Sequence, residues 1–410
     1  MKPTVYYFTQ SFPFGLGEQW KFVELSAIVR QGGRAVVIPL SFDGNNVARD
    51  IPSGVEVLGP ILESEVPEAR FAKLWRVFRS PRVFYFAREL LVSRAVTKRQ
   101  HFGAWLSASR QIDRVLDSAE VRSVLREAKS GDTLYFFWGR GACDIVPFVS
   151  KNLGVRSFVR MHGYDQFEAV NGGYIPYRRP LVRSATALFP VSSAGRDELQ
   201  SRYPEAASKV RLTPLGATEC GRASQSEDGV LRIVSCSFLR PVKRIGLLIS
   251  ALHLLRIPVA WTHVGDGPLM SEIREEAATL PANVTVEFNG RMRPQEIPAF
   301  YEARPIDVFL NVSESEGVPV SVQEAMSAGV PIIATDVGGT TDVVDASVGF
   351  LVPADVTPEE LARLLTSFSA LSAAERDVLR KSARERWESR CDANKLASEL
   401  AGTLIRKAGQ

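Results

Sequence analysis

Residues 307–344 of the chain read DVFLNVSESEGVPVSVQEAMSAGVPIIATDVGGTTDVV. DVFLNV and PIIAT are rich in apolar and β-branched residues and predict strands, while the segment between them predicts a helix. Pro319 suits the start of that helix, and Gly329 followed by Pro331 is a typical helix end. The stretch is therefore a strand, loop, helix, strand unit, which is the building block of an open parallel sheet.

The same alternation of strands and helices runs through both halves of the chain. The other runs that predict strands are VYYFT, RAVVIPL, TLYFFWG, SFVRMHG and ALFPVS in the first half, and LRIVSCS, VAWTHVG, NVTVEFNG and FLVP in the second. Strands that alternate with helices of ten to fifteen residues predict an α/β fold with parallel sheets. Because single cores stop growing at roughly 250–300 residues, a chain of 410 residues predicts two domains.

A polar segment rich in Gly and Ser, GATECGRASQSEDG at 216–229, separates the two halves and has the composition of a linker. We therefore predict an N-terminal domain over 1–218, a linker over 219–229 and a C-terminal domain over 230–385. The remaining residues, 386–410, predict an amphipathic helix that packs back toward the N-terminal domain, with Trp387 as its largest apolar anchor.

The loop and helix within residues 307–344 carry the candidate site. Ligands of open parallel sheets bind outside the carboxyl ends of the strands, where free N–H groups of helix N-termini attract anions. Gly317, Val318 and Val320 can supply such donors. Glu316 and Glu324 are eight residues apart, or about 12 Å of rise if the intervening chain is a regular helix. They are too far apart for an acid/base pair, but they can hold the two ends of one elongated ligand such as a nucleotide sugar.

The string from Glu316 to Glu324 resembles the E-x7-E signature of the family-4 retaining glycosyltransferases, in the form E-G-x-P-x-x-x-x-E-A-M-x-x-G-x-P-x-I. The resemblance implies the GT-B architecture, in which two Rossmann-like domains face each other across a cleft. It implies that the C-terminal domain binds the nucleotide-sugar donor and the N-terminal domain the acceptor. It also implies that Glu316 contacts the donor sugar near the reacting centre and that Glu324 binds the ribose.

A second element, VSCSFLRPVKRIGLLISAL at 234–252, resembles the R-x5-K phosphate-binding element of the same family. Lys243 takes the lysine position and is suited to a diphosphate. The arginine position is occupied by Phe238, which leaves one phosphate contact unassigned unless Arg240, two residues further on, supplies it.

Other matches to the family are shorter. FNGRM resembles a loop beside the nucleotide base, which implies contacts from Gly290, Arg291 and Met292, although a plain tight turn explains the glycine almost as well. Gly15 and Gly17 follow the first strand, where a backbone can approach a ligand closely. His162, in RMHGYD, lies where the family often has a histidine that faces the donor and, with Glu316, stabilises and orients the reacting groups.

No D-x-D motif occurs in the chain, although the other large glycosyltransferase fold uses that pair to hold a divalent metal on the diphosphate. We therefore predict metal-independent transfer without a cofactor, from a UDP- or GDP-linked sugar. Lys243, Arg240 and helix N-termini would stabilise the leaving nucleotide. Because no carboxylate can be assigned as a nucleophile, we expect front-face departure, in which a diphosphate oxygen helps to deprotonate the acceptor.

Residues 70–110 interleave aromatic side chains with basic ones. The acid Glu89 stands among ten cations, which are Arg70, Lys73, Arg76, Arg79, Arg82, Arg88, Arg94, Lys98, Arg99 and Arg110. A basic amphipathic surface suits an anionic membrane face, and many enzymes of the family elongate lipid-linked glycans. Nucleic acid would also favour such a patch, but no recognition motif accompanies it. In the alternative, the aromatic side chains are core and the charges are simply solvated.

Four cysteines without C-x-x-C spacing indicate neither a disulfide framework nor a zinc site, so we expect a cytoplasmic protein. No apolar run is long enough for a spanning helix, and any membrane contact would be peripheral, at the inner face. The predicted partners are a nucleotide-sugar donor and a glycan or lipid-linked glycan acceptor. The competing hypothesis is a catalytically weak scaffold subunit that binds sugar nucleotides. A dinucleotide oxidoreductase is disfavoured because G-x-G-x-x-G is missing after a strand.

Overall fold

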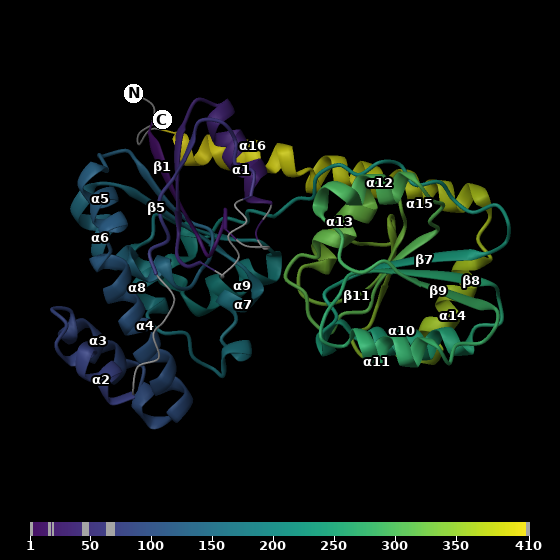
Figure 1. Ribbon diagram of the computed structural model, residues 1–410, viewed down its shortest axis with the longest axis horizontal. Coiled ribbons are helices and arrows are strands. Elements are labelled where there is room, and N and C mark those ends of the chain that lie inside the picture. Colours follow the sequence, from purple (N-terminus) through teal and green to yellow (C-terminus); the bar gives the residue numbers. More distant parts are fainter. Residues whose placement is uncertain (1–2, 15–17, 19, 43–48, 63–69, 407–410) are drawn as a thin grey trace. The chain divides into compact units, whose positions relative to one another are not determined.

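The computed structural model describes residues 3–14, 18, 20–42, 49–62 and 70–406. The chain divides into two compact units (Figure 1). Unit 1 comprises Met1–Thr213 together with Ala397–Gln410, and unit 2 comprises Pro214–Leu396.

Each unit contains a six-stranded sheet in which all neighbouring strands are parallel. The strands of unit 1 are β1 (Thr4–Thr9), β2 (Arg34–Pro39), β3 (Val55–Val57), β4 (Thr133–Phe136), β5 (Arg156–Met161) and β6 (Ala187–Pro190). The strands of unit 2 are β7 (Leu231–Cys236), β8 (Val259–Val264), β9 (Val284–Phe288), β10 (Val308–Asn311), β11 (Ile332–Thr335) and β12 (Gly349–Val352). The predicted α/β class with two Rossmann-like domains is confirmed.

The two sheets have the same winding. Their orders are β3-β2-β1-β4-β5-β6 and β12-β11-β10-β7-β8-β9, and both correspond to the doubly wound order 3-2-1-4-5-6. The direction of winding reverses between β1 and β4 in unit 1 and between β7 and β10 in unit 2. Ligands of such sheets bind at the carboxyl ends of the strands at this switch point, so the loops after these four strands are the candidate ligand-binding loops.

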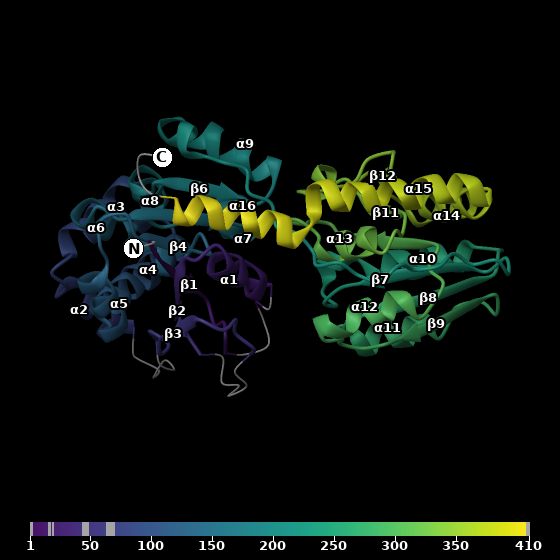
Figure 2. The same ribbon diagram turned by 90° about the horizontal axis from the view of Figure 1, so that it is seen from above.

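The helices cover both faces of each sheet (Figures 1 and 2). Those of unit 1 are α1 (Lys21–Arg30), α2 (Arg70–Phe78), α3 (Val83–Val92), α4 (Arg99–Asp117), α5 (Ala119–Glu127), α6 (Val146–Leu153), α7 (Gly163–Gln166), α8 (Arg178–Ser184) and α9 (Ser193–Arg202). Those of unit 2 are α10 (Ile245–Leu254), α11 (Met270–Ala277), α12 (Ile297–Glu302), α13 (Val320–Ser327), α14 (Pro358–Ser369) and α15 (Ala373–Arg386), and α16 (Ala393–Ile405) follows. Short 3₁₀ segments include η1 (Ala95–Thr97), η2 (Ala142–Ile145) and η5 (Pro241–Lys243).

Unit 2 has a separate apolar core on each face of its sheet. Leu248 of α10 and Leu361 of α14 belong to one cluster, whereas Phe300 of α12 and Met326 of α13 belong to the other. In Figure 1 the sheet accordingly lies between α10, α11 and α14 on one side and α12, α13 and α15 on the other. A strand that is buried on both faces reads as a continuous apolar run, as the inner strands β10 and β11 do.

The segment predicted as a linker, 219–229, belongs to unit 2 instead. The backbone N–H of Cys220 donates to Ser327 Oγ at 2.9 Å, and Ser226 Oγ donates to Asp307 Oδ2 at 2.6 Å. Asp307 is 1% exposed, so its carboxylate depends on donors such as the N–H and the hydroxyl of Ser226. The polar residues that indicated a linker thus include hydrogen-bond partners of the buried Asp307. The two units divide after Thr213.

The C-terminal helix also differs in extent from the prediction over 386–410. A π-helical turn, η8 (Trp387–Cys391), ends α15, and α16 begins at Ala393. Within unit 1, the carbonyl oxygen of Leu404 accepts hydrogen bonds from Thr133 Oγ1 at 2.7 Å and from Arg156 at 2.7 Å. The end of α16 therefore lies at the amino edge of the unit 1 sheet, beside the starts of β4 and β5.

Candidate functional site

The loop after β10 presents Glu316 at the switch point of unit 2. Glu316 Oε1 accepts a hydrogen bond from Asn311 Nδ2 at 3.1 Å and lies 2.6 Å from Lys243 Nζ. Asn311 is the last residue of β10, and its own Oδ1 accepts from Ser313 Oγ at 2.6 Å. The Glu316 side chain is 11% exposed and its carboxylate is thus held by the end of a strand and by a cation. Sequence reasoning missed Asn311.

Lys243 reaches this point from the loop after β7. It ends the 3₁₀ turn η5, and Arg244 then adopts a left-handed conformation before α10 begins at Ile245. Arg244 donates to the carbonyl oxygens of Val312 at 2.8 Å and Ala354 at 2.6 Å, which fixes the start of α10 against the loop after β10. The structure therefore brings together Lys243 and Glu316, two predicted site residues that are 73 positions apart.

The sequence placed Pro319 in the first turn of helix α13, but the helix begins one residue later, at Val320. Pro319 is extended, with φ −75° and ψ 101°, and caps the helix that starts at Val320. The free N–H groups of the first turn are therefore those of Val320, Ser321 and Val322, so Ser321 was missed and Val318 lies before the helix. The spacing from Glu316 to Glu324 is helical only over its second half, and the 12 Å rise assumed for a continuous helix is wrong.

Gly338, in the loop after β11, fixes the backbone at Glu316. Its φ is +54°, and a Cβ at this position would lie 1.8 Å from the Glu316 carbonyl oxygen. The neighbouring N–H of Gly339 donates to the Gly317 carbonyl oxygen at 2.9 Å. Only glycine allows this approach, so the GG pair in DVGGTT is a structural part of the site that the sequence displayed but did not explain.

Glu324 lies on α13, and no cation among the residues that the structure describes forms an ion pair with its carboxylate. Burial raises the pKa of Glu324 to about 7, and the described neighbours that feel its charge are Tyr301, Cys220 and Cys236. Within the described part of the chain its carboxylate accepts no hydrogen bond. A desolvated carboxyl group without a partner is costly in a folded protein, and this arrangement is typical of a ligand contact.

Phe238 occupies the arginine position as an exposed side chain, 52% accessible. The Arg240 guanidinium carbon lies 4.9 Å from the centre of the Phe238 ring, a cation–π arrangement. Arg240 forms no ion pair with any acidic residue in the described ranges. The Arg240 side chain is therefore directed back over Phe238, the residue that replaces the arginine of the family. No acidic side chain in the described ranges neutralises the charge of Arg240.

The loop after β9 contains the remaining predicted residues of unit 2. The carbonyl oxygen of Gly290 accepts from the N–H of Gly265 at 2.7 Å, which joins the loops after β8 and β9. Gly290 has φ +63°, Arg291 is exposed, and Met292 packs partly buried against the core that includes α12 and α13. Contacts of this loop with a base stay a prediction.

In unit 1, His162 follows β5 directly and caps α7. Its ring lies against Phe137 and Trp138, with centroid distances of 5.0 and 4.4 Å, and its Nδ1 is 3.5 Å from Asp165 Oδ2. Burial lowers the pKa of His162, so the ring is neutral at pH 7. The other predicted residues of this unit, Gly15 and Gly17, lie outside the described residues.

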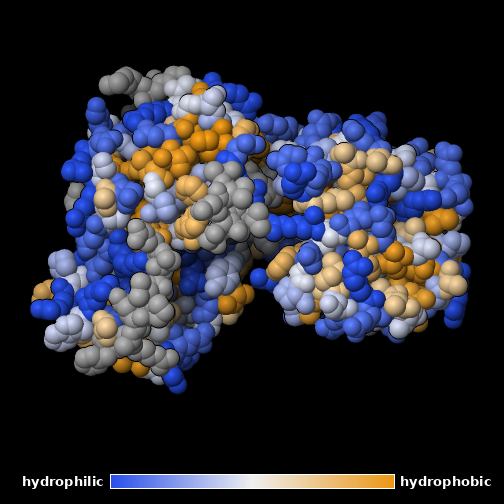
Figure 3. All heavy atoms as spheres, in the orientation of Figure 1, coloured by the Kyte–Doolittle hydropathy of each residue, from blue (hydrophilic) through white to orange (hydrophobic). Residues whose placement is uncertain are grey.

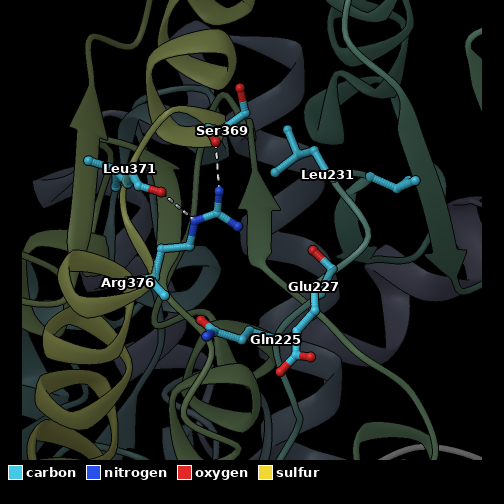
Figure 4. Close-up of a pocket in the computed structure, with 10 residues that line it drawn as sticks. Gln225, Glu227, Leu231, Ser369, Leu371 and Arg376 are labelled. Atoms are coloured by element: carbon cyan, nitrogen blue, oxygen red, sulfur yellow. Dashed lines mark hydrogen bonds between the residues drawn. The ribbon is translucent and has the colours of Figure 1, made fainter.

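A pocket of about 230 Å³ in unit 2 lies at the opposite edge of the sheet, where β7 begins at Leu231 (Figure 4). Arg376 donates to the carbonyl oxygens of Ser369 at 2.6 Å and Leu371 at 3.2 Å, and Gln225 and Glu227 line the other wall. The guanidinium is thus bound to the backbone, and none of the predicted site residues lines this pocket. In the described chain, no group of three or more His, Cys, Asp or Glu is placed to hold a metal ion.

The known proteins to which the chain is similar are named as enzymes that transfer sugars. The chain is similar to WcaL of Escherichia coli K12, which is named as a colanic acid biosynthesis glycosyltransferase, with 28% identity over 258 residues. It is also 28% identical over 278 residues to the GDP-mannose-dependent α-(1-6)-phosphatidylinositol monomannoside mannosyltransferase of Mycobacterium tuberculosis. These matches cover 59% and 60% of this chain, and 62% and 70% of the relatives. The chain thus spans less than two thirds of WcaL.

Among solved structures, the fold is similar to that of Anabaena Alr3699/HepE in complex with UDP and glucose. The TM-score is 0.62 with 18% identity, over 98% of this chain and 99% of that one. The family described as glycosyl transferases group 1 matches residues 221–386, which include the loops carrying Lys243, Glu316 and Glu324. Residues 221–386 therefore match the glycosyl transferases group 1, and the chain has the GT-B fold.

Proposed function

We propose that the protein is a retaining glycosyltransferase that moves a sugar from a nucleotide-diphosphate sugar to a glycan acceptor, either lipid-linked or a polysaccharide precursor. The observation that carries the proposal is the contact of Lys243 with Glu316 at the switch point of unit 2. A cation and a carboxylate there match the two chemical ends of a donor, its diphosphate and its sugar hydroxyls. The names of the relatives, which include a GDP-mannose-dependent enzyme and a UDP complex, support the same substrate class.

Different parts of the donor would bind different residues, according to their charge. Lys243, Arg240 and the N-terminus of α13 would receive the diphosphate, because each offers N–H donors to an anion. Glu324 would accept hydrogen bonds from the ribose, and Glu316 from the sugar hydroxyls. Lys243 is paired with Glu316, so an arriving diphosphate would share this cation.

In the proposed reaction, the bond between the anomeric carbon and the diphosphate oxygen breaks on the same face on which the acceptor oxygen bonds to that carbon. The acceptor proton passes to the departing diphosphate oxygen, which balances the charge. Lys243 and Arg240 would stabilise the negative charge that develops on the leaving group. Because its pKa is lowered, His162 would act as a neutral hydrogen-bonding group.

Single-turnover release of nucleotide from a panel of UDP- and GDP-linked sugars tests the proposal. A glycosyltransferase hydrolyses its correct donor slowly even without acceptor, and only a few sugars of the panel should release nucleotide. A scaffold subunit, for which Phe238 in the arginine position is the motivating feature, would bind a nucleotide sugar and release nothing.

The transfer is expected to be independent of metal ions, because the cations assigned to the diphosphate are side chains. Donor turnover should survive excess EDTA. Assays with EDTA alone, and with EDTA followed by Mg²⁺ or Mn²⁺, check the prediction. If EDTA abolishes turnover and a divalent ion restores it, the assignment of the phosphate contacts to Lys243 and Arg240 is wrong.

Residues 72–99 of unit 1 form what we call the basic apolar surface. Six large apolar side chains in it are more than half exposed, namely Trp75, Phe78, Phe84, Leu91, Val92 and Val96. The cations Arg79, Arg88 and Lys98 are exposed among them. The carboxylate of Glu89, the acid of this segment, accepts from Tyr174 and from the N–H of Tyr177. Apolar atoms lie between hydrophilic ones near α2 and α3, at the lower left of Figure 3.

We propose that this surface binds an anionic membrane face. Exposed aromatic and aliphatic side chains suit the acyl boundary, and cations suit anionic head groups. Arg82, which the sequence analysis counted among the cations of this surface, has a structural role instead. It pairs with Asp113 at 2.7 Å and with Asp117 at 3.2 Å and helps to hold α4. None of the described helices has the length and apolar content of a membrane-spanning helix.

Replacing Phe84 and Leu91 together by serine is expected to weaken binding to phosphatidylglycerol vesicles at least tenfold, because both side chains are exposed and would insert. Added NaCl should weaken the binding of the wild-type protein, since charges at the surface are screened over about 8 Å at physiological salt. Vesicle co-sedimentation measures both effects. Val378→Ser, at a 64% exposed position in unit 2, is the matched control. Equal binding to phosphatidylcholine vesicles would contradict the proposal.

A further inference from the structure

Unit 1 has a pocket at its own switch point. A cavity of about 290 Å³ lies where β1 and β4 end, between the loop after β1, the loop after β4 and helix α4. Gln10 comes from the first loop, Arg140 and Asp144 from the second, and Gln111 from α4. This is the position at which doubly wound sheets bind their ligands, yet none of the residues assigned above to the donor lines it.

Asp144 is the acidic group of this pocket, and it is 7% exposed. Burial raises the pKa of Asp144 to about 6, although the positive charges of Arg178 and Arg140 act against this shift. Neither arginine forms an ion pair with it in the described ranges. Its carboxyl group accepts a hydrogen bond from the backbone of Gly141 and one from the thiol of Cys143, whose sulfur lies 3.8 Å from Asp144 Oδ1. The carboxyl group is therefore desolvated with few donors, and a ligand hydroxyl would supply a further one.

Three other polar side chains of the pocket can both donate and accept hydrogen bonds. Gln10 and Gln111 contribute amides and Ser107 a hydroxyl. Arg140 is held in place, because its guanidinium donates to Asn171 Oδ1 and lies 5.2 Å from the centre of the Tyr164 ring. One cation and one carboxylate leave no excess of positive charge, so the lining suits a neutral polyhydroxylated ligand better than a phosphate.

The volume of the pocket and the apolar part of its lining further limit the kinds of ligand that fit it. Its volume is just below the roughly 300–1,000 Å³ of pockets for drug-sized ligands, so it suits a single ring and not an elongated nucleotide sugar. Ile175 and Pro176, both buried, form an apolar part of the lining. A pyranose ring has the matching character, with hydroxyl groups at its edge and C–H groups on its face.

We propose that this pocket binds one sugar residue of the acceptor, and that Asp144 accepts hydrogen bonds from its hydroxyl groups. The proposal rests on the proposed function and adds to it the residues that recognise the acceptor. Because the acceptor is a glycan, one of its rings would enter between Gln111, Arg140 and Asp144.

Saturation-transfer NMR of the full chain with a panel of methyl glycosides at millimolar concentration tests the inference. The wild-type protein should transfer saturation to at least one glycoside, and Asp144→Asn and Gln111→Ala should each weaken that binding at least fivefold. Asp197→Asn, at an exposed position of α9, is the matched control and should bind like the wild type. Binding of UDP and GDP should be the same in all four proteins, because the residues assigned to the diphosphate and the ribose lie in unit 2.

The outcomes separate this inference from the proposed function. Nucleotide binding and donor turnover without any glycoside signal would overturn the pocket assignment alone. A glycoside signal that is lost in Asp144→Asn, without turnover of any donor, would support the pocket and count against the transferase. Tighter binding of inorganic phosphate by Asp144→Asn would identify an anion site and overturn the inference. Asp144→Asn should melt no lower than the wild type at pH 7.5, because it removes a buried charge; if it does not fold, Gln111→Ala decides.

Discussion

Replacing Glu316 by glutamine is expected to lower turnover by about 100-fold or more, the scale seen when one preorganised electrostatic group is removed from an active site. Glutamine keeps the shape of the side chain and can still accept from Asn311, so the loop after β10 should keep its conformation. What is lost is the negative charge beside the donor sugar, where positive charge develops as the anomeric bond breaks.

The affinity for the donor should change little in Glu316→Gln. Lys243 loses its ion-pair partner and becomes more available to the diphosphate, which offsets the lost contact with the sugar. Single-turnover rates and calorimetric titration with the donor measure the two quantities separately. Glu314→Gln, an exposed carboxylate in the same loop, is the control and should retain wild-type turnover. Wild-type turnover in Glu316→Gln would remove Glu316 from the site.

The second large effect is expected at Arg240, which we propose replaces the arginine missing at position 238. Arg240→Ala should weaken binding of the nucleoside diphosphate by roughly 1.5–3 kcal/mol, or about 10- to 150-fold, the range for hydrogen bonds to charged groups. Binding of the bare nucleoside should barely change. A guanidinium can hold phosphate oxygens bidentately from a shifted position, and the Phe238 ring beneath it would fix its plane.

The double variant Phe238→Arg with Arg240→Ala should recover part of the lost affinity, since it restores the cation at the position where the family has one. Phe238 is exposed, so the substitution does not disturb the core. Arg256→Ala, an exposed arginine before β8, is the matched control. Unaltered diphosphate affinity in Arg240→Ala would leave Lys243 as the only cation that we assign to the diphosphate.

Local patterns in the sequence were sufficient for every strand except β3 and for the fold class. Strands buried on both faces appear as continuous apolar runs, and helix ends carry their own signals, such as Gly329 with Pro331. The short strand β3 was missed because its three residues, at least partly exposed in the structure, form no apolar run. The linker was misplaced because a polar segment that caps a buried acid, Asp307, has the same composition as one exposed to water.

The sequence by itself determined the loop that bears Glu316, the helix that bears Glu324 and the departure at Phe238, because each is readable within a few neighbouring residues. Only the tertiary structure decided that Lys243 contacts Glu316, that Arg82 pairs with Asp113, and that Asp144 lines a pocket with Gln10 and Gln111. The physical reason is that these contacts depend on which strands and helices become neighbours. Strand order places the ends of β7 and β10, and of β1 and β4, side by side, and no local pattern records that order.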